Sequence, residues 1–123
     1  MIRAYLLYTG TDGNSHVTTG SIAAGALVKT DHALFKESPA HASFDWHNAP
    51  IPQYVITLSG ILEFTLKSGK TFVIHPGEIL VATDHTGTGH QWRMLNDEPW
   101  RRIYVVYEKG ADICFIPDEP EQQ

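Results

Sequence analysis

Histidine and amide side chains near the middle of the chain have the clearest capacity for chemistry. The chain contains seven histidines, and two of them, His47 and His90, stand at the ends of strand-like segments. Gln53 opens the strand-like segment after Pro50 and Pro52, so it can face His47 across an antiparallel pair. Because histidine titrates near neutral pH, His47 and His90 could be catalytic acid or base groups if the fold brings them into one small-molecule pocket. The alternative is a hydrogen-bonded polar cluster with a structural role only.

Neighbouring residues extend this predicted pocket. Alternation along a strand places Trp92 on the same face as His90, and the glycine-containing loop before His90 begins at Asp84. The residues expected to line the pocket, besides the two histidines, are Trp46, Gln53, Val55, Asp84 and Trp92. Aromatic side chains of this kind can stack on a ligand, but they more often belong to a core or a dimer interface.

The segments that must position these residues have the pattern of short strands. Runs rich in β-branched and aromatic residues are cut by Gly, Pro and Asn at intervals of about 8 to 12 residues. Strand-like segments occupy residues 4–8, 16–21, 28–36, 42–47, 53–58, 61–66, 71–74, 78–82, 90–95 and 101–107. Residues 22–27 fit either a helical turn or a loop. This pattern predicts an all-β sandwich or barrel.

Length and composition predict one domain over residues 1–123. The chain has 123 residues, of which 42% are hydrophobic and 19% are charged, and no linker or repeat divides it. Its C-terminal segment is acidic and contains proline, so we expect residues 112–123 to be a partly frayed tail.

Charge and cysteine content suggest partners and location. The formal net charge of −5 argues against a nucleic-acid partner. Arg101 and Arg102 point to opposite faces of their strand, and we expect solvated edge charges, with an acidic ligand at one of them as the alternative. No apolar run approaches the roughly 20 residues that span a bilayer, and no signal-peptide pattern opens the chain, so we expect no membrane partner. The single cysteine, Cys114, cannot form an internal disulfide, which fits a reducing, cytoplasmic location.

Two blocks of the chain resemble the motifs of the cupin family. The first cupin motif has a His-x-His pair, then a Glu, then a Gly seven residues after the Glu. Here His47 matches the first His, and Gln53 lies seven residues before Gly60. The second motif runs from a Pro-Gly-Asp/Glu turn to a His, which residues 76–78 and His90 match. Residues 8–16, 46–55 and 87–90 also resemble blocks of small bacterial single-domain cupins, so the resemblance covers nearly the full length.

The resemblance implies a cupin-type jelly roll, a double-stranded β-barrel, that holds one divalent transition metal. Cupins bind Fe, Zn, Ni or Mn with three His and one Glu, and the matching ligands here are His47, Gln53 and His90. Ala49 stands where the second His would be. A neutral Gln oxygen binds a dication less strongly than a carboxylate does, so we expect a weakly held ion or a metal-free site, unless Asp84 supplies the missing charge.

The residues and the resemblance leave two functions open. The resemblance implies an enzyme of isomerase, cyclase, lyase or dioxygenase type, with or without a metal, acting on a small organic substrate. The alternative is a module that binds a small metabolite in a metal-free site without converting it. On either reading we expect a homodimer, because Tyr54, Ile56 and Leu58 make the strand face opposite Val55 apolar as well.

Overall fold

The computed structural model describes residues 1–118, and every regular element within them is a strand. The strands are β1 (Ile2–Thr9), β2 (Ser15–Ile22), β3 (Thr30–Ser38), β4 (Ser43–His47), β5 (Gln53–Ser59), β6 (Leu62–Leu66), β7 (Thr71–Ile74), β8 (Ile79–Ala82), β9 (His90–Met94), β10 (Trp100–Tyr107) and β11 (Phe115–Pro117). The all-β prediction is therefore confirmed. Residues 1–118 include no helix with the length and apolar character needed to cross a membrane.

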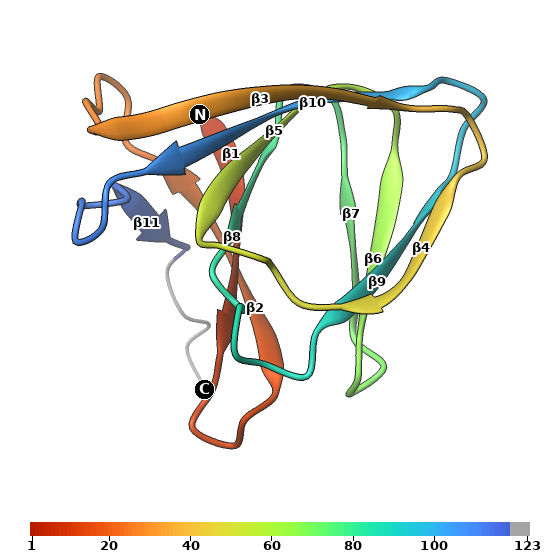
Figure 1. Ribbon diagram of the computed structural model, residues 1–123, viewed down its shortest axis with the longest axis horizontal. Coiled ribbons are helices and arrows are strands. Elements are labelled where there is room, and N and C mark those ends of the chain that lie inside the picture. The colour runs from red at the N-terminus through yellow and green to blue at the C-terminus, as the bar shows by residue number, and fades with distance from the viewer. Residues whose placement is uncertain (119–123) are drawn as a thin grey trace.

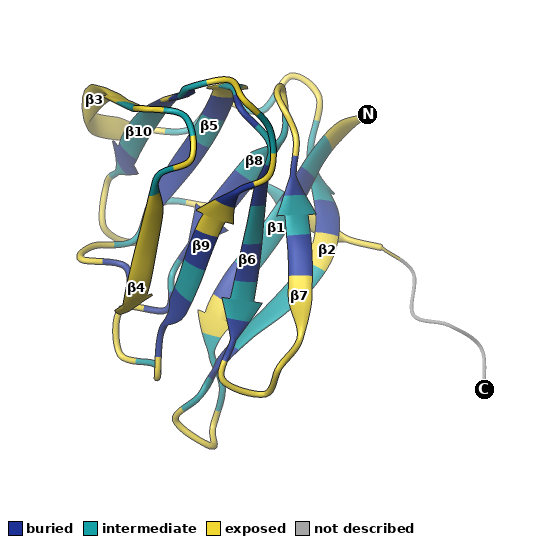
Figure 2. Ribbon diagram, turned by 90° about the vertical axis from the view of Figure 1, so that its right-hand side faces the viewer, coloured by how far each residue is buried: buried dark blue, intermediate teal, exposed yellow. Residues whose placement is uncertain are grey.

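The strands form two sheets that face each other (Figure 1). One sheet has seven strands in the order β11-β2-β1-β8-β5-β10-β3, and the other has four in the order β4-β9-β6-β7. The main core lies between them. It joins Leu7, Val55 and Trp100 of the large sheet to Phe64 and Trp92 of the small one. Buried and less buried residues alternate along β6 and β9 (Figure 2), as expected for strands with one face in a core.

A second, smaller core covers part of the outer face of the large sheet. It is centred on Ala4, Tyr54 and Val81, against which Ile113 and Phe115 pack. The Tyr54 hydroxyl donates a hydrogen bond of 2.7 Å to the carbonyl of Ile113. Strand β5 is thus apolar on both faces, with Val55 in the main core and Tyr54 in the second one, as its sequence predicts.

The C-terminal segment is more ordered than its composition suggests. Residues 115–117 form β11, which pairs antiparallel with β2, and Arg3 Nη1 lies 2.9 Å from Asp118 Oδ2. The expected fraying therefore does not extend to β11, because Phe115 gains burial against the second core. Residues 119–123 of the predicted tail lie outside the described residues. The segment 22–27 contains a turn and no helix.

One substitution tests whether the space between the sheets is the stabilising core. Leu62 is fully buried in β6, whereas Leu27 is 96% exposed in the loop before β3. Replacing Leu62 with Ala leaves a cavity, so we expect Leu62→Ala to lower the free energy of unfolding by about 2–5 kcal/mol in urea denaturation. The matched variant Leu27→Ala should change it by less than about 0.5 kcal/mol. Equal effects would contradict the burial of Leu62 between the sheets.

Candidate functional site

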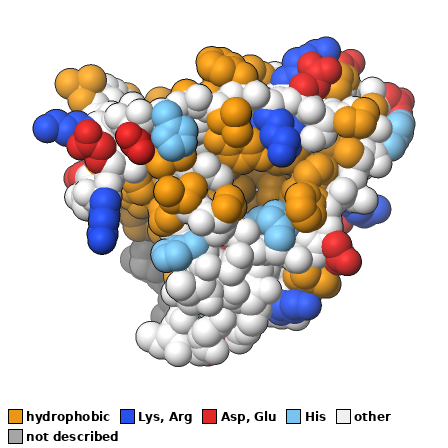
Figure 3. Space-filling model, in the orientation of Figure 1, with side chains coloured by type: hydrophobic (Ala, Val, Ile, Leu, Met, Phe, Trp, Pro, Cys, Tyr) orange, Lys and Arg blue, Asp and Glu red, His pale blue; other side chains and the backbone are white. Residues whose placement is uncertain are grey.

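A cavity of about 520 Å³ opens between the two sheets at the end where β4 and β5 are connected. Its walls come from β3, β5, β8 and β10 of the large sheet and from β4, β6 and β9 of the small one, with residues 48–51 between them. Figure 3 shows a hollow on this face that is framed by hydrophobic side chains, with histidine and basic side chains at its rim. The cavity is therefore mostly apolar, with a few polar groups, as small-molecule sites usually are.

His47 and His90 lie side by side on one wall of this cavity. They are direct partners in the antiparallel pairing of β4 with β9, and their ring centroids are 4.5 Å apart. Both line the cavity. The structure thus places these two residues, 43 positions apart in the sequence, next to each other on one cavity wall.

Asp84 holds His90 from behind rather than lining the cavity as expected. Its side chain is fully buried, and Oδ2 accepts hydrogen bonds from His90 Nδ1 at 2.9 Å and from Ser15 Oγ at 2.7 Å. Oδ1 accepts one from the Ala49 backbone N–H at 3.3 Å. Burial raises the pKa of Asp84, but the hydrogen bond and charge of His90, together with the bonds from Ser15 and Ala49, outweigh it and lower the pKa below its usual value.

A hydrogen bond to the backbone fixes the tautomer of His47. Its Nδ1 lies 2.8 Å from the carbonyl oxygen of Asp45, and since a carbonyl only accepts, Nδ1 carries the proton. Burial lowers the pKa of His47. The hydrogen bond to the Asp45 carbonyl raises this pKa, the charge of His90 lowers it further, and the charge of Asp84 raises it. The net result is a pKa below the usual value. His47 is therefore neutral at pH 7, with a free lone pair on Nε2.

The Nε2 atoms of both histidines are open to the cavity. Neither Nε2 atom makes a hydrogen bond within residues 1–118. Every fully buried side-chain nitrogen or oxygen in these residues has a hydrogen-bond partner, so an Nε2 atom without one is not fully buried. These atoms are therefore exposed to the space that a ligand would fill. The wall presents two adjacent imidazoles, each with its Nδ1 held by an acceptor and its Nε2 free.

Gly89 allows β9 to approach β4 this closely. Its φ is +89°, and a Cβ atom at this position would lie 2.4 Å from the carbonyl oxygen of His47. Its N–H donates a 3.0 Å hydrogen bond to Ser15 Oγ, which itself donates to Asp84. Only glycine fits both the backbone conformation and the close contact, so the glycine in this loop is required for the pairing of His47 with His90.

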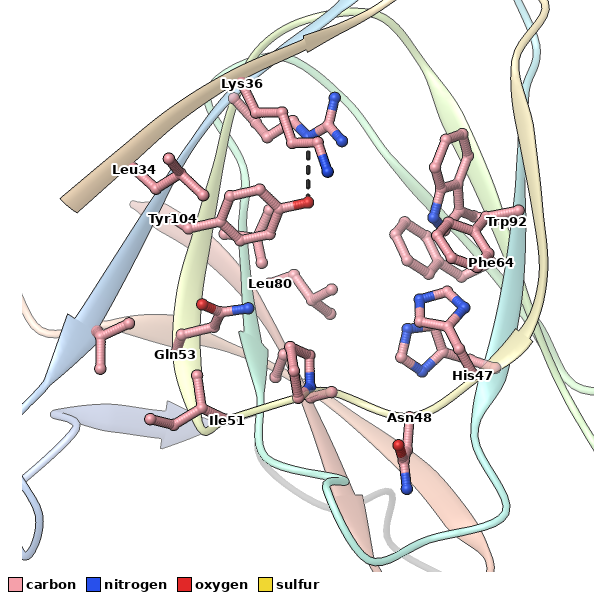
Figure 4. A pocket seen from close by; sticks show the side chains of 18 of the residues that line it. Leu34, Lys36, His47, Asn48, Ile51, Gln53, Phe64, Leu80, Trp92 and Tyr104 are labelled. Atoms are coloured by element: carbon pink, nitrogen blue, oxygen red, sulfur yellow. Dashed lines mark hydrogen bonds between the residues drawn. The ribbon is translucent and has the colours of Figure 1, made fainter.

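Gln53 lines the cavity from the wall opposite the histidines (Figure 4). It begins β5 in the large sheet, whereas His47 ends β4 in the small sheet. The expectation that the two face each other as partners in one antiparallel pair is therefore wrong. The segment with Pro50 and Pro52 crosses from one sheet to the other, because proline interrupts ladder pairing. The Gln53 amide makes no hydrogen bond with either histidine among the described residues.

The remaining predicted pocket residues divide between the cavity and the surface. Val55 and Trp92 line the cavity as predicted. Trp46 does not line it, and Lys67 Nζ lies 3.8 Å from the centre of its ring. An irregularity in the pairing of β4 with β9 between Phe44 and His47 interrupts the alternation, so Phe44 and His47 both face the cavity and Trp46 does not.

The histidines and Gln53 fit the metal site implied by the cupin resemblance only in part. Within residues 1–118, no three or more His, Cys, Asp or Glu side chains form a group that could hold a metal. His47 and His90 offer two neutral nitrogens, Gln53 belongs to the facing wall, and the Asp84 carboxylate is engaged behind His90. A set of two neutral imidazoles without a charged ligand suits a tightly held dication poorly.

The cavity also contains basic residues that the sequence pattern alone did not place there. Arg102, expected to be a solvated edge charge, is only 3% exposed and lines the cavity with Lys36 and Tyr104. The signal was present in the alternation of β10, in which Arg102, Tyr104 and Val106 share one face. The sequence did not show that this face turns inward.

Comparisons with known proteins show no family for this chain. No protein-family model matches it, and no curated protein is similar enough to count as a relative. The cupin resemblance therefore depends on the motif residues alone.

The buried Asp84 carboxylate predicts a pH-dependent contribution to stability. Its pKa in the folded state lies below the ordinary value of 3.8, so the contribution is complete above pH 4 and disappears as the pH falls through the folded-state pKa. We expect Asp84→Asn to lower the free energy of unfolding by about 1–3 kcal/mol at pH 7, the cost of losing a charge-assisted hydrogen bond. The deficit should shrink as the pH is lowered toward 3.

Chemical denaturation of both proteins between pH 7 and pH 3 measures this difference. Asp97→Asn is the matched control, because Asp97 lies on the surface beside His41 and its side chain is 93% exposed. A constant deficit across the pH range would show that the carboxylate charge has no part in the effect.

Proposed function

We propose that this chain is a cupin-type enzyme that transfers a proton on a small organic substrate bound between its two sheets. The observation that carries the proposal is the Asp84–His90–His47 arrangement on the wall of an apolar cavity. A carboxylate that holds one imidazole nitrogen while the other faces a ligand is the usual support of a histidine base.

His90 is the residue best supported as the proton acceptor. When its Nε2 takes a proton from the substrate, the imidazole becomes positively charged. The buried Asp84 carboxylate, whose Oδ2 lies 2.9 Å from His90 Nδ1, stabilises this charge. His47 is neutral, and its Nε2 is free to receive a proton or, once protonated, to return one to a second substrate atom. Removal of a proton at one atom and its return at another is the chemistry of isomerases and cyclases, and removal with loss of a leaving group is that of lyases.

The arrangement of the motif residues supports the more specific proposal that this all-β fold is a cupin jelly roll. The first cupin-like block supplies the end of β4 and the start of β5, and the second runs from the β7–β8 turn to the start of β9. Both blocks deliver their histidines to the same cavity. The expectations of no nucleic-acid or membrane partner and of a cytoplasmic location stay predictions.

Proton transfer can be tested without knowing the substrate in advance. Mixtures of small organic acids, ketones and enols are incubated with the protein in D2O, and proton NMR follows the loss of C–H signals and the growth of products. We expect at least one compound to react. The rate should fall about 100-fold or more in His90→Gln, the usual range for loss of a general base, and by a smaller factor in Asp84→Asn.

His75→Gln is the control, because His75 lies on the surface in the β7–β8 turn. A compound that shifts the resonances of His47 and His90 but neither exchanges nor reacts would overturn the enzyme proposal in favour of a binding module. An unchanged rate in His90→Gln would also refute it.

The same preparations test the metal prediction. A divalent transition metal at His47 and His90, whose rings are adjacent, stays a prediction, and elemental analysis measures it directly. About one ion per chain, lost in His47→Gln, would support the metal site and with it dioxygenase chemistry, which needs a redox-active ion. Turnover that persists after chelation would support proton transfer by the imidazoles alone.

The outer face of the large sheet supports the proposal of a homodimer. Cross-strand register aligns Phe35 of β3, Ile103 of β10 and Ile56 of β5 in one apolar row. Phe35 is 74% exposed, and Leu58 on the same face is 53% exposed. Because β3 is the free edge of this sheet, a second copy can pair with it about a twofold axis and cover the row.

Light scattering during size exclusion tests this dimer. We expect a mass of two chains at about 100 μM, and a shift toward one chain in Phe35→Asp, because a buried, unpaired carboxylate opposes association. Leu27→Asp, at an exposed position away from the row, is the control. A wild-type protein that stays monomeric at this concentration contradicts the proposal.

A further inference from the structure

The wall of the cavity opposite the histidines contains a buried positive charge with no acidic partner. Arg102 is only 3% exposed, and none of the ion pairs within residues 1–118 includes it. A buried charge is costly unless it is compensated, so the absence of a carboxylate beside this guanidinium needs an explanation.

The hydrogen bonds of Arg102 satisfy its geometry but not its charge. Nε donates to Tyr104 Oη at 3.1 Å, and Nη1 donates to Ser38 Oγ at 2.8 Å and to the Trp100 carbonyl at 3.1 Å. All three acceptors are neutral. The guanidinium also lies 3.8 Å from the centre of a ring of Trp100, which fixes its position. Nη2 has no acceptor among the described residues, and it is not a fully buried atom, so it is open to the cavity that Arg102 lines.

Lys36 adds a second positive charge beside the first. It is the direct cross-strand partner of Arg102 in the pairing of β10 with β3, and both residues line the cavity. Figure 4 shows Lys36 next to the hydrogen bond that the Tyr104 hydroxyl accepts. Like charges directly opposite each other in a sheet destabilise it. Among the described residues, no Asp or Glu side chain lines the cavity to offset this repulsion.

We propose that Arg102, Lys36 and Tyr104 form a carboxylate-binding subsite, so that the ligand of this cavity is a small organic carboxylate with an apolar or aromatic body. Arg102 Nη2, the Lys36 ammonium and the Tyr104 hydroxyl, which still has its own proton to donate, are the three donors. One guanidinium nitrogen, one ammonium and one hydroxyl are three donors, which is enough for the two oxygens of a carboxylate.

The rest of the cavity fits the body of such a molecule. Phe64 and Trp92 of the small sheet and Leu80 and Val55 of the large one provide apolar surface in the cavity. A carboxylate held at Arg102 therefore extends its carbon skeleton toward His47 and His90. The inference rests on the proposed function where it names the substrate class, but binding alone tests the subsite.

Benzoate and its neutral counterpart benzamide are suitable probes, because they differ in charge and hardly in shape. We expect chemical-shift titration to show benzoate binding at least about 10-fold more tightly than benzamide, the effect of a charge-assisted hydrogen bond. Lys36→Met should weaken benzoate about 5-fold or more and leave benzamide unchanged. Lys70→Met, an exposed lysine in the β6–β7 turn, is the control and should change neither.

Arg102→Met should abolish the preference for benzoate. Because this variant removes buried contacts and can fail to fold, Lys36→Met and Tyr104→Phe, which keeps the ring, provide the independent test. Two results would overturn the proposal. One is that benzamide binds as tightly as benzoate, and the other is that the preference for benzoate is undiminished in both Lys36→Met and Tyr104→Phe. Preferential binding of phenyl phosphate over benzoate would overturn the carboxylate assignment.

The two proposals fail separately. His90→Gln should keep the preference for benzoate, since His90 lies on the opposite wall. If benzoate binds as expected and no compound exchanges or reacts, the subsite stands and the proton-transfer function does not. If a neutral compound reacts while benzoate fails to bind, the function stands and the subsite does not.

Discussion

The buried carboxylate of Asp84 is the interaction on which the geometry of the site depends. Its two oxygens join Ser15 of β2, the backbone at Ala49 in the crossing segment, and His90 at the start of β9. These groups come from three distant parts of the chain and from both sheets. A single side chain therefore links the two sheets at the end where the cavity opens, and it also sets the orientation of the His90 imidazole.

The two sheets contribute different chemistry to the cavity between them. The small sheet brings His47 and His90, whose free nitrogens can accept a proton. The large sheet brings Arg102 and Lys36, whose charges attract an anion. Because the sheets pack across one apolar core, the packing of the sheets sets the distance between the two groups. A ligand that contacts both groups must span this distance, so the fold favours ligands of a matching length.

Local patterns predict most of the fold and only part of the site. The strands follow from alternation and from turn residues, which act within a few positions. His47 and His90 can be placed together because each ends or begins a strand in a recognisable motif. The opposite wall could not be predicted in this way. The burial of Arg102 depends on the pairing of β10 with β3 and β5, and a register shift between Arg101 and Arg102 accompanies it. Such pairings join residues distant in sequence.

The uncompensated charge on the large sheet connects stability with binding. A guanidinium that is 3% exposed and faces a lysine across a strand pair makes the free protein less stable than a neutral pair would. A bound anion offsets the repulsion between Arg102 and Lys36 and gives the guanidinium an ionic partner. Part of the binding free energy therefore comes from removing a destabilising interaction that is already present in the folded protein. Stacking on Trp100 and the bonds to Ser38 and Trp100 hold the guanidinium in position before any ligand arrives. The guanidinium is therefore preorganised, and little ordering of this side chain remains to oppose binding.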